Sequence, residues 1–303
     1  MTPPAEPAPT RLPASGLAAL VAVVVLWGAA YPMMKIAALE IPLFAFRSLS
    51  ALVPGVILLI MARLGRHSLG VVRESRLPLV IAAICTVSVT HLLTTLSTLY
   101  MASGQTSIML YTMPVWAFII GVPVLGERPT WGHWAGVGLG LCGIVLLWFA
   151  TAGDGGVSLG VLIGVIAAIS WAAGTVAAKK AIGRVVPIVF TGWVFVIGSL
   201  PLGLIGLGIG ELNQFRPVSG AAIWSAMFVA MGTNFIGFLA FYHIVRMVPA
   251  TVASLSVLAV PAVAFSAGFV LLDERMTVTD GIAFSLIAAA LATVLPKPSR
   301  KKT

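Results

Sequence analysis

Long apolar runs, separated by short segments that hold the charged residues, account for most of this 303-residue chain. A helix that crosses ~30 Å of hydrocarbon needs about 20 residues, so an apolar run of that length predicts one membrane span. The runs predict ten such helices, at residues 15–37, 42–62, 77–99, 104–125, 131–151, 157–178, 187–209, 221–245, 250–272 and 279–295. The pattern therefore indicates an all-α integral membrane protein.

The second half of the chain repeats the first. An apolar run carries Pro114 and ends at Glu127, and a matching run carries Pro261 and ends at Glu274, 147 residues later. In both copies the Glu is followed by Arg and then, two positions on, by Thr. The first helices of the two halves also match at an offset of 144, where Gly16, Trp27, Ala29 and Lys35 return as Gly160, Trp171, Ala173 and Lys179. A duplication of five helices explains both sets of matches.

The distribution of Lys and Arg predicts how the helices lie across the membrane. With the N-terminus in the cytoplasm, fourteen basic residues fall on the cytoplasmic side, and Arg216 and Arg275 fall on the opposite side. Cytoplasmic loops carry an excess of Lys and Arg, so we expect both termini to be cytoplasmic. Because five is an odd number, the second half enters the membrane upside down. We expect a disordered cytoplasmic tail at 1–14, inverted five-helix repeats at 15–151 and 157–295, and a basic cytoplasmic tail at 296–303.

Composition agrees with a membrane environment. Apolar residues make up 59% of the chain and charged residues 9%, with a mean hydropathy of +1.08; a soluble domain averages about 45–50% apolar and about 25% charged residues. The net charge of +9 lies in short clusters between the apolar runs, which indicates membrane topology and not a nucleic-acid partner. Cys85 and Cys142 lie in apolar runs and are expected to be free thiols. We identify no cleavable signal peptide.

The paired segments that run from Pro to Glu-Arg-x-Thr, and the Trp and Lys shared by the two first helices, resemble the EamA branch of the drug/metabolite transporter superfamily. The resemblance covers residues 15–295 and departs from the pattern at Asp273, where the first copy has Gly126. It implies a multi-pass transporter of the bacterial inner membrane that needs no cofactor. Within the family the chain is most similar to aromatic amino-acid exporters, which implies a cargo of aromatic and other neutral amino acids or related small metabolites.

Inverted repeats are typical of secondary transporters that work by alternating access, with a substrate site near the midplane. Polar residues on the third predicted helix are candidates for this site, because Ser88, His91, Thr94, Thr95 and Thr98 follow one another at helical spacing. Polar groups are expensive in lipid, so this face is expected to point inward. Hydrogen bonds to neighbouring helices would explain the stripe without a site. His91 lies in the middle of its span and titrates near physiological pH, which favours a role in binding substrate or protons.

Rings and amide groups on other helices predict the rest of the pocket. Such a lining suits a flat apolar side chain on a polar head. Trp27 also lies deep in its helix, where core packing is the default for an aromatic residue. The predicted substrate contacts are His91, Thr94, Thr95, Tyr111, Trp171, Thr175, Asn234, Phe238 and Tyr242.

Pro114 and Pro261 occupy equivalent positions in the fourth and ninth predicted helices. Proline inside a helix removes a backbone hydrogen bond and bends the helix, so paired kinks at this depth are candidates for gating. A kink without a gating role would leave the same pattern. Lys35, Arg47 and Lys179 lie near helix ends, where their side chains are expected to reach the interface. Lys35 or Arg47 could instead meet a carboxylate near the outer opening of the predicted transport pathway.

Several sequence features are absent from this chain, and their absence argues against certain classes of function. All nine acidic residues fall in tails, loops or helix ends, so the chain lacks a mid-span carboxylate for a bare organic cation. It also lacks the Walker loop of ATP-driven pumps and the motifs of intramembrane hydrolases, and we expect no catalytic residue or metal. Proton coupling would have to run through His91, and facilitated diffusion is the alternative. We expect the protein to function as a monomer, because one chain holds both halves of the inverted pair.

Three other functions stay open. The first is export of a phosphorylated or nucleotide-sugar compound, which would need basic residues at mid-depth. The others are a lipid-modifying membrane enzyme and a non-transporting receptor.

Overall fold

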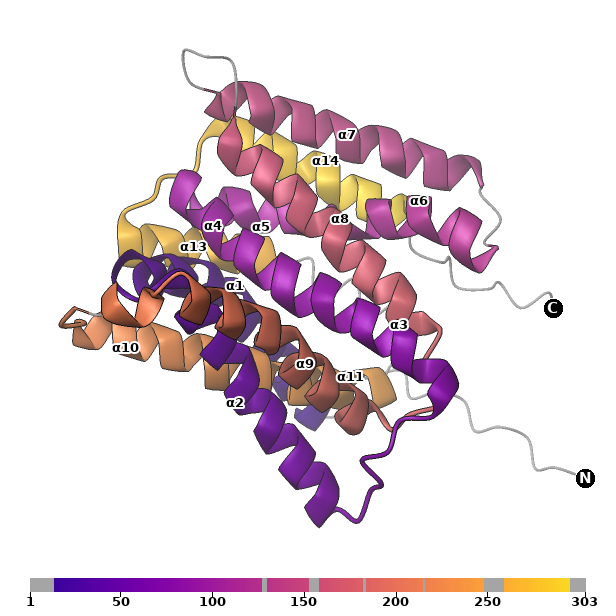
Figure 1. Ribbon diagram of the computed structural model, residues 1–303. Coiled ribbons are helices and arrows are strands. Elements are labelled where there is room, and N and C mark those ends of the chain that lie inside the picture. Colours follow the sequence, from indigo (N-terminus) through magenta and orange to yellow (C-terminus); the bar gives the residue numbers. More distant parts are fainter. Residues whose placement is uncertain are drawn as a thin grey trace, which may run out of the picture.

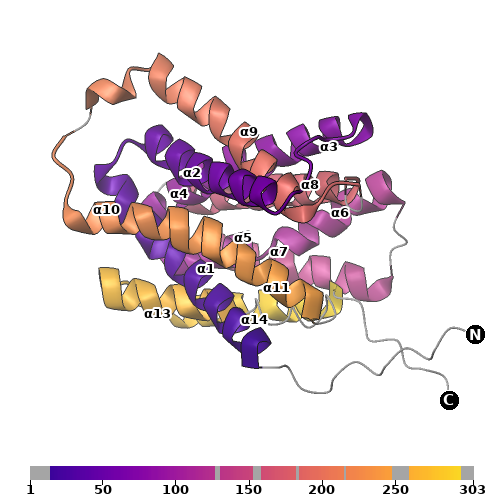
Figure 2. The same cartoon turned by 90° about the horizontal axis from the view of Figure 1, so that it is seen from below.

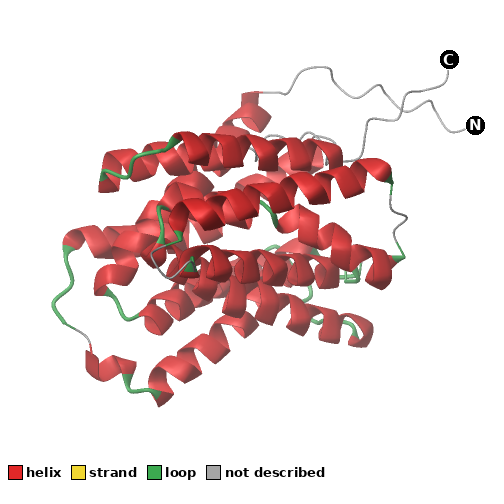
Figure 3. Cartoon of the chain, turned by 90° about the horizontal axis from the view of Figure 1, so that it is seen from above, coloured by secondary structure: helices red, strands yellow, loops and turns green. Residues whose placement is uncertain are grey.

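The computed structural model describes residues 14–126, 130–152, 158–181, 184–214, 216–247 and 259–294. Within these ranges the chain forms helices and loops and no β-strand (Figure 3). Eight of the described helices are long and apolar enough to cross a membrane, and shorter apolar helices cover Val260–Leu272 and Val278–Thr293. The prediction of an all-helical membrane fold is confirmed. The first part of the ninth predicted helix lies outside the described residues, so the count of ten spans stays a prediction.

The helices follow the order of the predicted apolar runs (Figure 1). The first half contains α1 (Ala14–Glu40), α2 (Leu43–Leu64), α3 (Arg73–Ala83), the π-helix η1 (Ile84–His91), α4 (Leu92–Tyr100), α5 (Ser103–Leu110), α6 (Met113–Leu125) and α7 (Trp131–Thr151). The second half contains α8 (Leu159–Lys179), α9 (Pro187–Gly208), the 3-10 helix η2 (Glu211–Gln214), α10 (Gly220–Met227), the π-helix η3 (Phe228–Gly237), α11 (Phe238–Met247), α13 (Val260–Leu272) and α14 (Val278–Val294). The segments α3–η1–α4 and α10–η3–α11 each form one long helix with a π-helical centre.

Two pairs of equivalent helices, α2 with α9 and α7 with α14, pack side by side and run in opposite directions. The α2–α9 and α7–α14 pairs lie at different edges of the bundle (Figure 1). Glu211, which follows the last turn of α9, accepts hydrogen bonds from the backbone N–H groups of Phe44 (3.0 Å) and Ala45 (2.8 Å), so α9 ends where α2 begins. A carboxylate at this position also stabilises the positive end of the α2 dipole.

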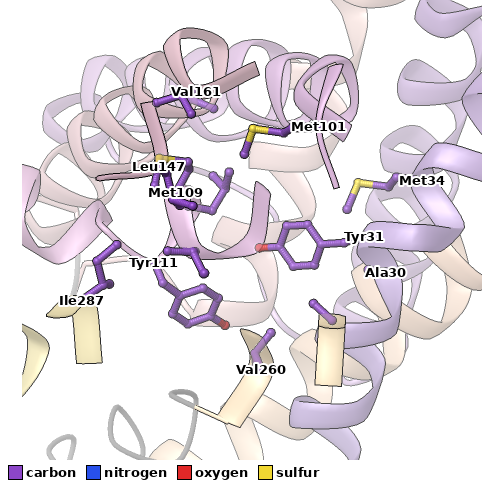
Figure 4. Close-up of a cluster of buried hydrophobic side chains, with 14 of the residues drawn as sticks. Ala30, Tyr31, Met34, Met101, Met109, Tyr111, Leu147, Val161, Val260 and Ile287 are labelled. Atoms are coloured by element: carbon purple, nitrogen blue, oxygen red, sulfur yellow. The ribbon is translucent and has the colours of Figure 1, made fainter. Parts of the chain in front are cut away.

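The first helix of each half packs against the other half. Helix α1 contacts α10, η3, α11 and α13, and α8 contacts α3, η1, α4, α5 and α6 (Figure 2). The side chain of Ser97 donates to the carbonyl of Gly160 (3.0 Å), and Lys35 donates to the carbonyl of nearby Met101 (3.3 Å). Helix α8 therefore begins at the end of the bundle where its equivalent, α1, ends. The largest buried cluster accordingly combines side chains from both halves, such as Tyr31, Met109, Val161 and Ile287 (Figure 4).

Both prolines lie in the first turn of a helical segment. Pro114 lies in the first turn of α6, after a break at Tyr111 and Thr112, and Pro261 lies in the first turn of α13. A proline is well placed at a helix start because its missing N–H would have had no partner there. The span expected at 104–125 is present as Ser103–Leu125. Its α-helical pattern is interrupted at Tyr111 and Thr112, just before Pro114, which divides it into α5 and α6.

The rest of the repeated motif forms the turn to the next helix. Gly126 (φ 69°) and Asp273 (φ 53°) both adopt the left-handed conformation that ends α6 and α13. Thr277 begins α14 by accepting a hydrogen bond from the backbone N–H of Asp280 (3.2 Å), and Thr130 begins α7 in the same way (3.4 Å). Each copy of the motif thus begins a helix at its proline and ends that helix at a residue with a left-handed backbone. A threonine then caps the start of the next helix.

Replacing Asp273 by Gly should stabilise the protein, because glycine adopts a left-handed backbone without the steric cost that an L-residue bears. We expect Asp273→Gly to raise the free energy of unfolding by about 0.5–1 kcal/mol, measured by thermal unfolding in detergent. The matched change at the equivalent position, Gly126→Ala, should lower it by a similar amount. Destabilisation by Asp273→Gly would contradict this account of the turn.

Candidate functional site

A cavity lies between the halves, near the middle of the long helices. It contains about 680 Å³ of space free of protein atoms, including the part that is open to solvent. The first half lines it with Trp27, Ala30, Tyr31, Met34, Arg47, Thr86, Thr90, His91, Thr94, Leu110 and Tyr111. The second half contributes Trp171, Val229, Thr233, Asn234 and Phe238. The lining is thus built from rings, small hydroxyls, one amide and one guanidinium.

The π-helices η1 and η3 supply a large part of this lining. They start at Ile84 and Phe228, an offset of 144, so the feature belongs to the repeat. In a π-helix the backbone bonds reach five residues back, and such segments are frequent at functional sites. The hydroxyl of Thr90 follows the same spacing and donates to the carbonyl of Cys85 (2.7 Å). The wider turn brings polar side chains from successive turns toward the cavity.

A chain of rings crosses one side of the cavity. The ring centroids of Trp27 and Phe238 lie 5.5 Å apart, those of Phe238 and Phe195 lie 5.2 Å apart, and those of Phe195 and His91 lie 6.0 Å apart. The two tyrosines Tyr31 and Tyr111 lie in the adjoining buried cluster (Figure 4). Trp27 packs in the core, as expected, and is also part of the cavity wall.

The structure brings most of the predicted contacts together. Six of them line the cavity: His91, Thr94, Tyr111, Trp171, Asn234 and Phe238. Thr95 and Thr175 do not, because each hydroxyl bonds back along its own helix, to the carbonyls of His91 (3.0 Å) and Trp171 (2.9 Å). The side chain of Tyr242 lies outside the described residues. Pro114 and Pro261 are not among the lining residues. A substrate or gating role for any of these residues stays a prediction.

The polar stripe on the third long helix divides into two groups. The hydroxyl of Ser88 donates to the carbonyl of Gly198 on α9 (2.6 Å), and that of Thr98 donates to the carbonyl of Thr95 (2.6 Å). His91 and Thr94 face the cavity instead. The π-helical turns shift the face that residues before His91 present, which separates Ser88 from the cavity-facing residues, whereas Thr95 and Thr98 bond within α4.

Arg47 lies inside the protein and does not reach the interface. Its side chain is 2% exposed and lines the cavity, with its guanidinium carbon 5.3 Å from the centroid of the Phe46 ring. The expectation that Arg47 extends to the interface is therefore wrong. Placing an unpaired Arg at the centre of a membrane helix costs about 2.5–3.5 kcal/mol on insertion scales, so a buried one is by default a candidate functional residue.

A signal in the sequence could have located Arg47. It shares a helix face with Ala51, Pro54 and Leu58, at spacings of four, seven and eleven residues, and all three are buried. This face of small and apolar residues packs inward, so a charge in register with it points inward too.

Unsatisfied polar atoms concentrate at the cavity. Six buried side-chain nitrogen or oxygen atoms of the described residues have no hydrogen-bond partner. Four of them belong to cavity residues: Trp27 Nε1, Arg47 Nε, Arg47 Nη1 and His91 Nδ1. Buried polar groups are otherwise nearly always paired, so such a concentration marks a place where a bound molecule can supply the partners.

An ion pair between the halves lies at the end of the bundle where α1 ends. Lys35 Nζ lies 2.7 Å from Glu274 Oε1, and both side chains are largely buried. The other carboxylate oxygen, Oε2, accepts a hydrogen bond from the backbone N–H of Ser103, the first residue of α5 (2.8 Å). Lys35 thus meets a carboxylate of the other half and not the lipid interface. The pair joins α1, α5 and the α13–α14 turn.

Comparisons with known proteins agree with this architecture. The model of the EamA-like transporter family matches the chain twice, at residues 14–149 and 158–295. The chain belongs to the EamA-like transporter family. It is 27% identical to the uncharacterized transporter YvbV of Bacillus subtilis, over 96% of this chain and 95% of YvbV. It is 26% identical to an uncharacterized transporter of Archaeoglobus fulgidus (90% and 96% of the two chains).

The family defines the general activity. Like the Escherichia coli protein named as the uncharacterized inner membrane transporter YedA, which is 23% identical over 91% of this chain and 89% of YedA, this EamA-like protein is a multi-pass membrane transporter. A solved crystal structure that is 19% identical has the same fold, with a TM-score of 0.64 over 92% of this chain and 97% of the other.

The close approach of η3 to α1 should matter for the cavity wall. A Cβ atom on Gly237 would lie 2.6 Å from Trp27 Nε1, so Gly237→Ala must displace the indole ring. We expect it to destabilise the protein by about 1–3 kcal/mol and to lower transport. Gly208→Ala is the matched control, because a Cβ on Gly208, the last residue of α9, meets no atom within 4 Å. Equal thermal stability and transport in the two variants would contradict the described packing.

Proposed function

We propose that this EamA-like protein is a secondary transporter that exports aromatic and other neutral amino acids, or related small metabolites, by alternating access. In this proposal ten helices form two inverted repeats in a bacterial inner membrane, with both termini in the cytoplasm. The observation that carries it is the ring-lined cavity between halves whose equivalent helices run in opposite directions. Two inverted halves can pack in two equivalent ways, which gives inward-open and outward-open states of similar energy.

The pair formed by Lys35 and Glu274 supports alternating access, because it joins the halves at one end of the cavity. The repeat places Lys179 and Glu127 at the corresponding positions of the other end. Glu127 lies outside the described residues. In the proposed cycle the two pairs alternate, each closing its own end while the other is open.

The cavity lining supports an aromatic cargo. Trp27, Trp171 and Phe238 provide faces for a flat apolar group, while hydroxyls and the unpaired nitrogen atoms provide hydrogen bonds for a polar head. Proton coupling through His91 and facilitated diffusion both fit this arrangement. A membrane-embedded enzyme or receptor has no specific support in the site.

Export of a phosphorylated or nucleotide-sugar compound is a second candidate, because Arg47 places a cation in the cavity. Among the described lining residues, Arg47 is the one with a permanent charge. A phosphate dianion or a diphosphate would leave at least one negative charge unpaired there. The aromatic cargo is therefore favoured.

Transport in proteoliposomes tests the function, with labelled phenylalanine as the first substrate and unlabelled amino acids as competitors. His91→Ala should reduce uptake about five- to tenfold, the effect of losing one hydrogen bond worth about 1–1.5 kcal/mol. His67→Ala, in the exposed α2–α3 loop, is the control. Undiminished uptake by His91→Ala at normal expression would remove His91 from the mechanism, and binding without any uptake would favour a receptor.

Breaking the ion pair should open its end of the cavity more often. Lys35→Met should increase the rate at which an impermeant thiol reagent labels a cysteine placed at Met34 in the cavity wall, in a background lacking Cys85 and Cys142. A pair worth about 1 kcal/mol predicts about a fivefold increase. The exposed Lys180→Met is the control. An unchanged labelling rate would show that the pair does not hold this end closed.

A further inference from the structure

The most informative feature of the cavity is a buried guanidinium that no described side chain neutralises. Arg47 Nε and Nη1 are buried and have no hydrogen-bond partner. Of the nine acidic residues, the structure describes six, and the ion pair found among the described residues joins Lys35 to Glu274 and does not involve Arg47. No described acidic residue pairs with Arg47, so a bound molecule is a candidate to supply its partner.

The described carboxylates that are buried already have partners elsewhere. Glu211 accepts bonds at the start of α2, and Asp280 accepts bonds from Thr277 and Gln105 at the start of α14. Glu40, at the end of α1, is exposed and accepts bonds from Ser219. None of these three groups lines the cavity.

We propose that Arg47 is the subsite for a substrate carboxylate, and that the cavity selects monocarboxylates with a flat apolar body, for which an amino group is not required. This inference rests on the proposed function of the cavity as the substrate site. Guanidinium groups only donate hydrogen bonds, and a carboxylate can accept two parallel ones while neutralising the charge. The indole N–H of Trp27, which is also only a donor, is a second unpaired donor in the same cavity.

The same lining explains why the amino group contributes little. The described lining offers an α-ammonium group neutral oxygens and ring faces but no carboxylate to neutralise its charge. In an amino acid this group would also lie close to the guanidinium that holds the carboxylate, which costs electrostatic energy in a low-dielectric site. A ring-bearing acid without the amino group should therefore bind better than the amino acid, and the corresponding amine should bind worst.

Three compounds with the same phenylethyl body test this order: 3-phenylpropanoate, phenylalanine and 2-phenylethylamine. Affinity is measured by isothermal titration on the purified full chain in detergent. We expect 3-phenylpropanoate to bind at least several-fold more tightly than phenylalanine, with no measurable binding of the amine. Binding of the amine as tight as that of 3-phenylpropanoate would overturn the proposal.

Two substitutions localise the effect to Arg47. Arg47→Met should weaken binding of both carboxylates at least tenfold and leave thermal stability equal or higher, because the variant loses an unpaired buried charge. Arg47→Lys should give intermediate affinity, since it keeps the charge but not the two parallel bonds. Arg216→Met, which removes a charge from an exposed loop, is the matched control and should bind like the unaltered protein.

Unchanged carboxylate affinity in Arg47→Met would overturn the proposal. If Arg47→Met does not fold, Arg47→Lys decides. Unchanged carboxylate affinity in Arg47→Lys would overturn the proposal, and intermediate affinity would support it. Uptake of the same compounds into proteoliposomes separates the two conclusions. The expected order of affinities without uptake would refute the transport function and leave the subsite standing. Uptake of the amine as fast as that of the acids would refute the subsite and leave the transporter standing.

Discussion

A polar group inside a membrane protein has no bulk water to bond with, and this constraint organises the molecule. Some polar side chains solve it locally, as Thr95 and Thr175 do by bonding to carbonyls of their own helices. Others tie helices together, as Ser88 does to α9 and Asn234 to the carbonyl of Ser50 on α2 (2.8 Å). Of the six buried side-chain atoms that stay unpaired among the described residues, four face one shared cavity. The cavity is thus defined as much by its unpaired donors as by its shape.

The inverted arrangement places this cavity where both halves can move around it. Each first helix packs against the other half, so a shift of one half changes the contacts of α1 and α8 together. The pair of Lys35 and Glu274 joins the halves at one end. The proposed alternating access requires such a contact to be of modest strength, because the protein must leave each state as readily as it enters it. A much stronger contact would hold one state and stop the cycle.

Hydrophobic periodicity predicted the all-helical architecture well, because the length of an apolar run is fixed by the thickness of the bilayer. Hydrophobic periodicity could not predict the π-helical segments, because a helix with one wider turn keeps nearly the same pattern of apolar and polar residues. The π-helix before His91 changes which polar residues of that helix face the cavity. The break at Tyr111, just before Pro114, leaves no sign in the hydrophobicity and could not be predicted in detail. Arg47 lies near a helix end, which favours an interfacial position for its side chain. Its helix face, shared with the buried Ala51 and Leu58, instead directs the side chain inward.

The central claim is that two equivalent halves face opposite sides of the membrane. Trp131 and Val278, the first residues of α7 and α14, correspond in the repeat and are 90% and 82% exposed. Single cysteines at these positions, in a chain without Cys85 and Cys142, can be labelled in intact cells with an impermeant maleimide. The account predicts that position 278 reacts from outside and position 131 only after the cytoplasmic side is opened. Reaction of both from the same side would contradict it.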